Sequence, residues 1–179
     1  RVVDVMEYNF ILNRDITIDT IKRIIALKQE HWPYDYNSQI SWIKQNLQDE
    51  DIHYFLCEGE RLIAYLNIVF LDVESDYHKF KILGIGNVCV DKQYEHTGIG
   101  RKLITSLNSY LDQIKESAIL LCKSQLAGFY EKCNWHKLPS KTVFISQRKY
   151  ENDVMVYSLN DFVNSELQDT KKIFISRNF

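Results

Sequence analysis

The chain has 179 residues, 45% of them hydrophobic, which is typical of one globular domain with a core of its own. Its formal net charge of −2 excludes the strongly basic surface of a dedicated nucleic-acid binder or of a polybasic membrane-surface protein. No apolar run reaches the ~20 residues that span a bilayer, and the N-terminus lacks a secretory signal pattern, so we expect a cytoplasmic protein with a small partner.

Apolar periodicity and turn residues divide the first half of the chain into a strand, two helices and a hairpin. The expected elements, in chain order, are a strand over Val2–Leu12, a helix from Thr17 or Asp19 to the Trp32-Pro33 break, a helix from Asn37 or Ser38 to the acidic run 49–51, and two strands around the turn Glu58-Gly59-Glu60.

Strands and helices then alternate along the second half of the chain and end in two further strands. After a polar loop at 72–79, we expect a strand over 81–90, a helix over Ile99–Ile114, a strand over Ala118–Cys122, a helix over Gln125–Cys133, and strands over 142–146 and 154–159. This order favours an α/β or α+β fold with a mixed sheet. We expect one domain over 1–159, with 160–179 as a tail or an extra element of it.

The four cysteines, Cys57, Cys89, Cys122 and Cys133, are widely spaced and form no C-x-x-C pair. Reduced thiols in an apolar core fit this spacing better than a disulfide framework or a zinc site does. We therefore expect neither a disulfide nor a metal.

Two of the six glycines, Gly98 and Gly100, lie in the stretch EHTGIGRK, where a strand leads into a helix. The first amides of a helix have no intrahelical partner and bind anions when nothing blocks the approach. Glycines remove the block, and Arg101 and Lys102 add positive charge, so a diphosphate could lie against amides 96–101. The alternative is that Gly98 only permits a tight turn.

This stretch resembles the cofactor segment of the GCN5-related N-acetyltransferases (GNATs), in which an aliphatic strand precedes a Q/R-x-x-G-x-G/A loop and a helix. The stretch AGFYEKCNW, Ala127–Trp135, is similar to A-x-x-F-Y-x-x-x-G-F, a second signature of that family. The two motifs and the strand order extend the resemblance over Val2–Leu159. Two positions depart from the family: Glu95 stands where it has Gln or Arg, and Asn134 replaces a glycine.

The resemblance implies a mixed, mostly antiparallel sheet of six to seven strands, splayed between its fourth and fifth strands and flanked by about four helices. It also implies that backbone groups at the splay bind the pantetheine arm of acetyl-CoA and that the glycine loop binds the pyrophosphate. The implied cofactor residues are Val88, Cys89, Val90, Glu95, His96, Thr97, Gly98, Ile99, Gly100, Arg101, Lys102, Gln125 and Tyr130.

Acetyl transfer from a thioester to an amine needs a deprotonated nucleophile, a stabilised oxyanion and an acid for the leaving thiolate. The resemblance makes Tyr130 the acid and the backbone N–H of Cys89 a donor to the thioester carbonyl. Two alternatives stay open: Tyr130 as a space-filling aromatic residue, and Cys89 as the site of an acyl-cysteine intermediate, which an apolar strand disfavours by raising the thiol's pKa.

The general base and the acceptor site are less well defined by the sequence. Many relatives have a glutamate on the fourth strand, but no carboxylate lies at Gly84–Asn87. The candidate bases are carboxylates expected to border the acceptor cleft: Glu30, Asp35, Asp72, Glu74 and Asp76. For each carboxylate the alternative is an ordinary solvated charge, and for the aromatic residues it is packing between the helices. The acceptor-site residues that we expect are Glu30, Trp32, Asp35, Asp72 and Glu74.

We therefore expect an acetyl-CoA-dependent N-acetyltransferase that acetylates a primary amine of a small molecule by direct attack. The segment FYEKCNWHKLPSKTVFI is similar to one in aminoglycoside 2'-N-acetyltransferases, which makes an aminoglycoside-like acceptor one candidate. The alternatives are a peptide or protein N-acetyltransferase, and a catalytically inactive, CoA-binding regulatory module, which Glu95 and the missing strand glutamate suggest. Apolar residues in the segment from Asn160 favour a homodimer.

Overall fold

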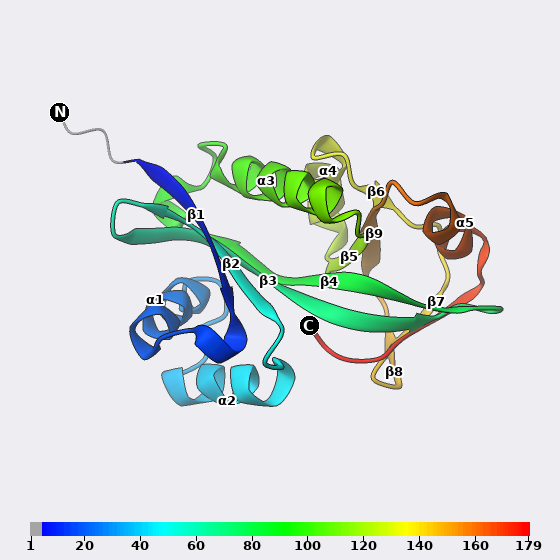
Figure 1. Cartoon of the computed structure of the whole chain (residues 1–179), viewed down its shortest axis with the longest axis horizontal. Helices are drawn as coiled ribbons and strands as arrows, with labels where there is room; N and C mark the ends of the chain where they lie inside the picture. Colours follow the sequence, from blue (N-terminus) through cyan, green and yellow to red (C-terminus); the bar gives the residue numbers. More distant parts are fainter. Residues whose placement is uncertain (1–4) are drawn as a thin grey trace. The chain divides into compact units, whose positions relative to one another are not determined.

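The computed structural model describes residues 5–179 of the chain (Figure 1). Its strands are β1 (Met6–Leu12), β2 (Ile52–Glu58), β3 (Arg61–Glu74), β4 (Lys79–Val90), β5 (Ala118–Cys122), β6 (His136–Lys137), β7 (Thr142–Ile145), β8 (Arg148–Tyr150), β9 (Asp153–Tyr157) and β10 (Lys172–Ile175). Its α-helices are α1 (Ile18–Gln29), α2 (Tyr36–Asn46), α3 (Ile99–Ile114), α4 (Ser124–Lys132) and α5 (Asp161–Asp169). No helix in this described part combines the length and apolarity needed to cross a bilayer.

The strands form one sheet in the order β6-β9-β5-β4-β3-β10-β7-β8, to which β2 adds by pairing with β3, and β1 by pairing with β2. Most pairs are antiparallel, whereas β4 with β5 and β10 with β7 are parallel. The parallel register of β4 joins Leu83–Ile85 to Ala118–Leu120. The expected fold class, a mixed and mostly antiparallel sheet with helices, is confirmed.

The number of strands is larger than the six to seven expected. Residues 5–179 contain ten strands. The strands that were not expected are β6, with two residues, β8, with three, and β10, with four. Strands of two or three residues carry too few alternating positions to be recognised in a sequence, whereas β10 lies in the segment expected as a tail or an extra element. The first expected strand also included Val2–Asp4, which lie outside the described residues.

The chain divides into two compact units. Among the described residues, unit 1 comprises 5–69, 86–104 and 179, and unit 2 comprises 70–85 and 105–178. Three continuous elements, β3, β4 and α3, therefore contribute residues to both units. The glycine loop belongs to unit 1, whereas the tyrosine helix α4 belongs to unit 2.

In unit 1, α1 packs its apolar stripe on the sheet. The hydroxyl of Thr17 caps this helix by accepting a hydrogen bond from the N–H of Thr20 at 3.2 Å. Figure 1 shows α1 and α2 together on one side of β1 and β2. Burying a Leu, Ile or Phe side chain contributes about 1.5–3 kcal/mol. The resulting core cluster consists of Ile24, Leu27, Phe55, Cys57, Leu62, Tyr65 and Cys89.

In unit 2, the tyrosine helix α4 ends in a turn that Asn134 makes possible. Its φ of 67° is left-handed, a conformation that asparagine tolerates best after glycine. The next residue, Trp135, is 2% exposed, and its indole N–H donates to Oδ1 of Asn108 at 2.8 Å. The replacement of a signature glycine by asparagine is thus compatible with the turn.

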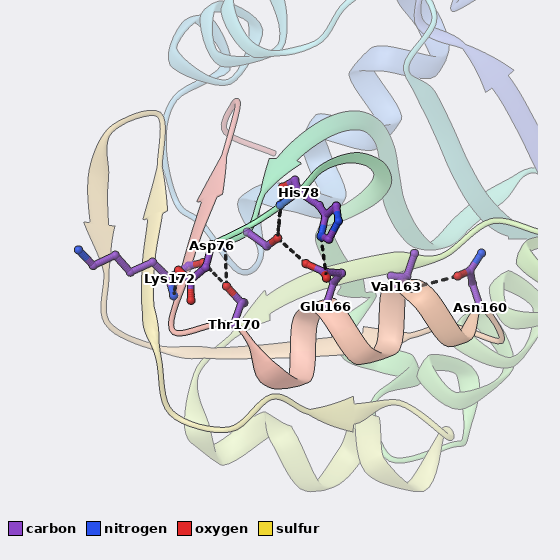
Figure 2. A network of polar contacts seen from close by, with 8 residues as sticks. Asp76, His78, Asn160, Val163, Glu166, Thr170 and Lys172 are labelled. Carbon is purple, nitrogen blue, oxygen red and sulfur yellow. Dashed lines mark hydrogen bonds and ion pairs between the residues drawn. The ribbon is translucent and has the colours of Figure 1, made fainter.

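The segment from Asn160 forms helix α5 and strand β10, and Figure 2 shows how polar contacts join it to the turn between β3 and β4. The carboxylate of Glu166 accepts hydrogen bonds from the Ser75 hydroxyl at 2.6 Å and from Nδ1 of His78 at 2.8 Å. Asp76 accepts the backbone N–H of Lys171 at 2.7 Å and donates its own N–H to Thr170 Oγ1 at 2.8 Å. These contacts fix α5 within unit 2.

Candidate functional site

The loop between β4 and α3 turns sharply through left-handed residues. His96 has φ 61° and Gly98 has φ 87°. A Cβ atom added to Gly98 would meet nothing within 4 Å, so the backbone conformation, rather than lack of space, requires glycine there. Gly98 therefore permits the tight turn that the sequence suggested, and helix α3 begins at the next residue.

The first turn of α3 presents backbone donors. The N–H of Lys102 donates to the carbonyl of Gly98 at 3.0 Å, which closes the first helical turn. The N–H groups of Ile99, Gly100 and Arg101 precede this bond, and such first-turn donors have no intrahelical partner. The side chains of Arg101 and Lys102 are exposed beside them. A helix start with these properties favours an anion.

Side chains of unit 1 hold the loop in place. The carboxylate of Asp91 accepts from Nη2 of Arg61 at 2.7 Å and from the N–H of Gln93 at 2.9 Å. Glu30, at the end of α1, accepts the N–H of Lys92 at 3.1 Å. The loop is thus preorganised before any ligand arrives. Asp91 at a strand end is a typical capping residue, but nothing in the sequence indicated that Arg61 is its partner.

The end of β4 combines a bulge-like residue with buried and half-buried positions. Asn87 has φ 53°, a left-handed conformation within the strand. Nε2 of His31 lies 2.6 Å from the carbonyl oxygen of Val90, so that carbonyl already has a partner. Val88 is half-buried and Cys89 is 4% exposed.

The thiol of Cys89 is protonated at neutral pH. Burial raises its pKa from 9.0 to about 12, although the nearby Lys28 opposes that shift. A thiol in this state is a weak nucleophile, which disfavours the acyl-cysteine alternative. The role proposed for the backbone N–H of Cys89 does not depend on the thiol.

Three of the expected acceptor residues lie in unit 1, and each makes a local contact. Glu30 holds the N–H of Lys92, as described above. Trp32 is half-buried against the core cluster. Asp35 caps α2 by accepting the N–H of Ser38 at 2.7 Å, and this hydrogen bond lowers the pKa of its carboxyl group. Their roles toward an acceptor stay predictions.

The remaining acceptor residues lie in unit 2 on the outer part of β3. Asp72 and Glu74 are exposed and lie 3.6 and 3.8 Å from the ammonium groups of Lys81 and Lys79. Exposed pairs of this kind contribute about 0–1 kcal/mol. Both carboxylates therefore have the ordinary surroundings of solvated charges, and their binding role is a prediction.

Tyr130 and Gln125 come from α4 in unit 2. Tyr130 is 5% exposed, and its ring centroid lies 5.1 Å from that of Phe129 and 6.4 Å from that of Trp135. Gln125 is exposed in the first turn of the helix. The aromatic packing accounts for the ring of Tyr130, while the function of its hydroxyl is a prediction.

Two buried ionisable groups of unit 1 were not expected as such from the sequence. Lys28 is 3% exposed with Nζ 4.7 Å from the centroid of the Trp42 ring, and burial lowers its pKa to about 8. His53 is fully buried between the Tyr65 hydroxyl at 2.7 Å and Oδ1 of Asn13 at 2.8 Å, and burial lowers its pKa to about 4. The signal for Lys28 was its place on the apolar stripe of α1.

Several solved protein structures are similar to this one in fold. The structure of Escherichia coli ElaA has a TM-score of 0.62 at 16% identity, over 85% of this chain and 98% of that one. An acyl-CoA N-acyltransferase from Pseudomonas aeruginosa has a TM-score of 0.62 at 15% identity, over 86% and 100%. Arabidopsis thaliana NAA60 in complex with acetyl-CoA gives 0.62 at 15% identity, over 86% and 100%. No curated protein matches the sequence significantly.

The sequence itself matches a family model described as "Acetyltransferase (GNAT) domain" over residues 49–137. The matched segment runs from the start of the β2–β3 hairpin, through β4 and the glycine loop, to the end of the tyrosine helix and β6. It therefore contains both motifs on which the resemblance was based. With the fold and the family model in agreement, the chain belongs to the GCN5-related N-acetyltransferase superfamily of acyltransferases.

Proposed function

We propose that the protein is an acetyl-CoA-dependent N-acetyltransferase that transfers the acetyl group to a primary amine of a small molecule. The observation that carries this proposal is the preorganised loop from Asp91 to Gly98, which leads into the first-turn amides of α3. Such a helix start favours a polyanion. The similar NAA60 structure contains acetyl-CoA, which supports coenzyme A as that polyanion.

The pyrophosphate would lie on the amides of His96 to Arg101, with Arg101 and Lys102 adding positive charge. Glu95 is exposed, which is compatible with a carboxylate directed into solvent and away from the phosphates. We assign the pantetheine arm to the backbone of Val88, Cys89 and Val90. Because His31 occupies the carbonyl of Val90, we expect this strand residue to contribute least.

Bound acetyl-CoA supplies the thioester for the reaction. The acceptor nitrogen forms a C–N bond with the acetyl carbon, and the C–S bond breaks. The N–H of Cys89 would hold the oxygen on which negative charge develops. Tyr130 would give its phenolic proton to the departing thiolate. Both roles follow from the family motifs, and Tyr130→Phe tests the role of the phenol.

The acceptor amine must also lose a proton, since alkylammonium groups have pKa values near ~10.4. No carboxylate occupies Gly84–Asn87 of β4. A water chain ending on one of the acceptor-site carboxylates is the simplest route, and Glu30 and Asp35 are the candidates within unit 1. Amines with a lower pKa are therefore expected to be the better acceptors at neutral pH.

Two measurements on the purified protein test the proposal. Isothermal titration with acetyl-CoA should give saturable binding, and absence of heat at millimolar ligand would refute coenzyme A as the ligand. Thiol release from acetyl-CoA across a panel of amines should then exceed the rate without amine. Binding without amine-dependent thiol release would instead favour the inactive regulatory module.

A further inference from the structure

Gly86 of β4 lies against the main chain of a residue far away in the sequence. A Cβ atom at this glycine would lie 2.5 Å from the carbonyl carbon of Phe179 and 3.0 Å from its oxygen. These distances are too short for a real side chain, so the main chain of Phe179 occupies the space that a side chain on β4 would fill. Both residues belong to unit 1.

Asn67 of β3 lies at the same point and has an unsatisfied donor. Its Nδ2 atom is 3.0 Å from the Cβ position of Gly86. The residue is fully buried, and its Oδ1 accepts a hydrogen bond from Nδ2 of Asn87 at 2.5 Å. Among residues 5–179, no atom accepts a hydrogen bond from Nδ2 of Asn67. An unpaired buried donor is costly, so a ligand oxygen at this point would be favoured.

The position of this donor along β4 suggests what the ligand is. Gly86 and Asn87 come immediately before Val88–Val90, the backbone that the proposed function assigns to pantetheine. An amide N–H₂ group is a neutral donor that suits a carbonyl or carboxylate oxygen. The chemistry therefore fits an acceptor that carries such an oxygen next to its amine, as an aminoacyl compound does.

We propose that Asn67 binds a carbonyl-type oxygen of the acceptor, and that the main chain of Phe179 covers this position until the acceptor displaces it. This inference rests on the proposed function, because it names the acceptor class of the same site. In the covered state, Nδ2 of Asn67 lacks a partner; in the acceptor complex, it gains one. Binding an acceptor thus offsets the loss of the contact between Phe179 and Gly86.

The first test separates acceptors that carry the oxygen from those that lack it. Asn67→Asp keeps an oxygen for Asn87 but removes the donor. For leucinamide, KM should rise roughly three- to tenfold, the value of one hydrogen bond. For isopentylamine, which has the same side chain without the carbonyl, the same substitution should raise KM less. Equal changes in KM for the two amines would overturn the proposal.

A leucyl tripeptide as a third acceptor identifies the source of the oxygen. A loss with leucinamide alone assigns a small aminoacyl acceptor, and a loss with the tripeptide as well assigns a peptide N-terminus. Either result supports the donor role of Asn67. Titration of Asn67→Asp with acetyl-CoA keeps this test apart from the proposed function, because cofactor binding should be unchanged whichever acceptor is used.

The second test addresses the cover. Removal of residues 177–179 should lower KM for leucinamide. In the unchanged protein, the molecules in which Phe179 covers Asn67 cannot bind the acceptor, which weakens the apparent affinity. Phe179→Ala is the matched control, because it removes the ring and retains the main chain that contacts Gly86. Hydrogen exchange of residues 177–179 should accelerate when leucinamide saturates the protein. A rise in KM after the removal, or exchange that leucinamide leaves unchanged, would overturn the covering role.

Discussion

The loop after β4 and the turn after β3 are both polar connections, but they differ in whether their polar groups are already paired within the protein. The turn at 75–78 pairs its groups with α5 and the start of β10. The backbone N–H of Asp76 donates to Thr170 Oγ1, and the carboxylate of Glu166 accepts a hydrogen bond from Nδ1 of His78 (Figure 2). The loop at 91–98 is also anchored by side chains, yet it leads into first-turn amides of α3 that have no intrahelical partner.

This difference separates stability from function. A turn whose donors and acceptors are paired with each other contributes to the folded state and has little left to offer a ligand. A loop that Arg61 and Glu30 hold in place, and that leads into unpaired first-turn amides, can bind an anion without reorganisation. Variants in the loop should therefore change ligand binding, and variants in the turn should change stability.

The largest effect is expected where the chemistry, rather than binding or folding, depends on one hydroxyl. Tyr130→Phe should reduce kcat by about 10²-fold or more, because a general acid contributes at least that much. The dissociation constant of acetyl-CoA should change little. Tyr157→Phe is a matched control, since it removes a hydroxyl of unit 2 that bonds Asp112 at 2.9 Å. An unchanged kcat would assign Tyr130 to packing alone.

The next largest effect concerns Lys28, whose side chain on α1 is buried and lies outside both the loop and the turn. Its pKa falls from 10.5 to about 8 on folding because burial disfavours the ammonium form. Between about pH 8 and 10.5 the unfolded chain therefore holds a proton that the folded chain has released, and stability rises with pH across this window. The whole gain is roughly 3 kcal/mol.

Lys28→Met should abolish this rise, which urea unfolding between pH 7 and 10 would measure. Burial raises the pKa of the Cys89 thiol next to Lys28 from 9.0 to about 12, so above about pH 9 this thiol makes stability fall with pH, in the variant as in the unchanged protein. His53 is neutral throughout, since its pKa is lowered to about 4. The exposed Lys44 on α2 provides the control, Lys44→Met. A rise in stability of the same size in Lys28→Met would refute the buried charge as its origin.

Much of the fold follows from local patterns in the sequence. The expected bounds of α3 and β5 agree with the structure. Helix α3 has an amphipathic stripe that begins directly after Gly98, and β5 is a short apolar run with polar residues at both ends. Asp72 and Glu74 were assigned to a loop because they are charged. In fact β3 continues through them, with Leu71 and Val73 buried and the side chains of Asp72 and Glu74 exposed.

The candidate site was only partly predictable for the same reason. Gly98 and its helix start are local features, and both were expected from the sequence. The partners that fix the loop, Arg61 and His31, come from other strands and helices, and a single sequence does not show which residues will meet. The contact of Gly86 with Phe179 is of this kind too: the glycine was visible, but the backbone that requires it was not.

Gly98→Ala tests whether the conformation of the loop at 91–98 matters for acetyl-CoA binding. Alanine would be strained at a φ of 87°, at a cost of about 1–3 kcal/mol, although its Cβ meets no neighbour. If the loop relaxes to relieve the strain, the amides lose their arrangement and acetyl-CoA binding should weaken roughly tenfold. Gly128→Ala on α4 is the control, because there a Cβ also meets nothing and helical alanine is favoured over glycine. Equal affinities in both variants would contradict a role for the loop conformation.

The smallest effect is expected in the turn, from Asp76→Asn. Hydrogen bonds from the backbone, above all from the N–H of Lys171, lower the pKa of this carboxyl group below its usual 3.8. The carboxylate therefore stabilises the fold above pH 3.8, and this stabilisation is lost as the pH falls through the lowered pKa. An asparagine amide would face N–H donors with a donor of its own, so Tm should drop slightly at pH 7, while the difference from the unchanged protein should shrink toward pH 3. Asp169→Asn removes a charge from the same region as a control. Because the polar groups of the turn are paired with α5 and residues 170–171, acetyl-CoA affinity should not change, and a weakened affinity would show that turn and loop are not separate in function.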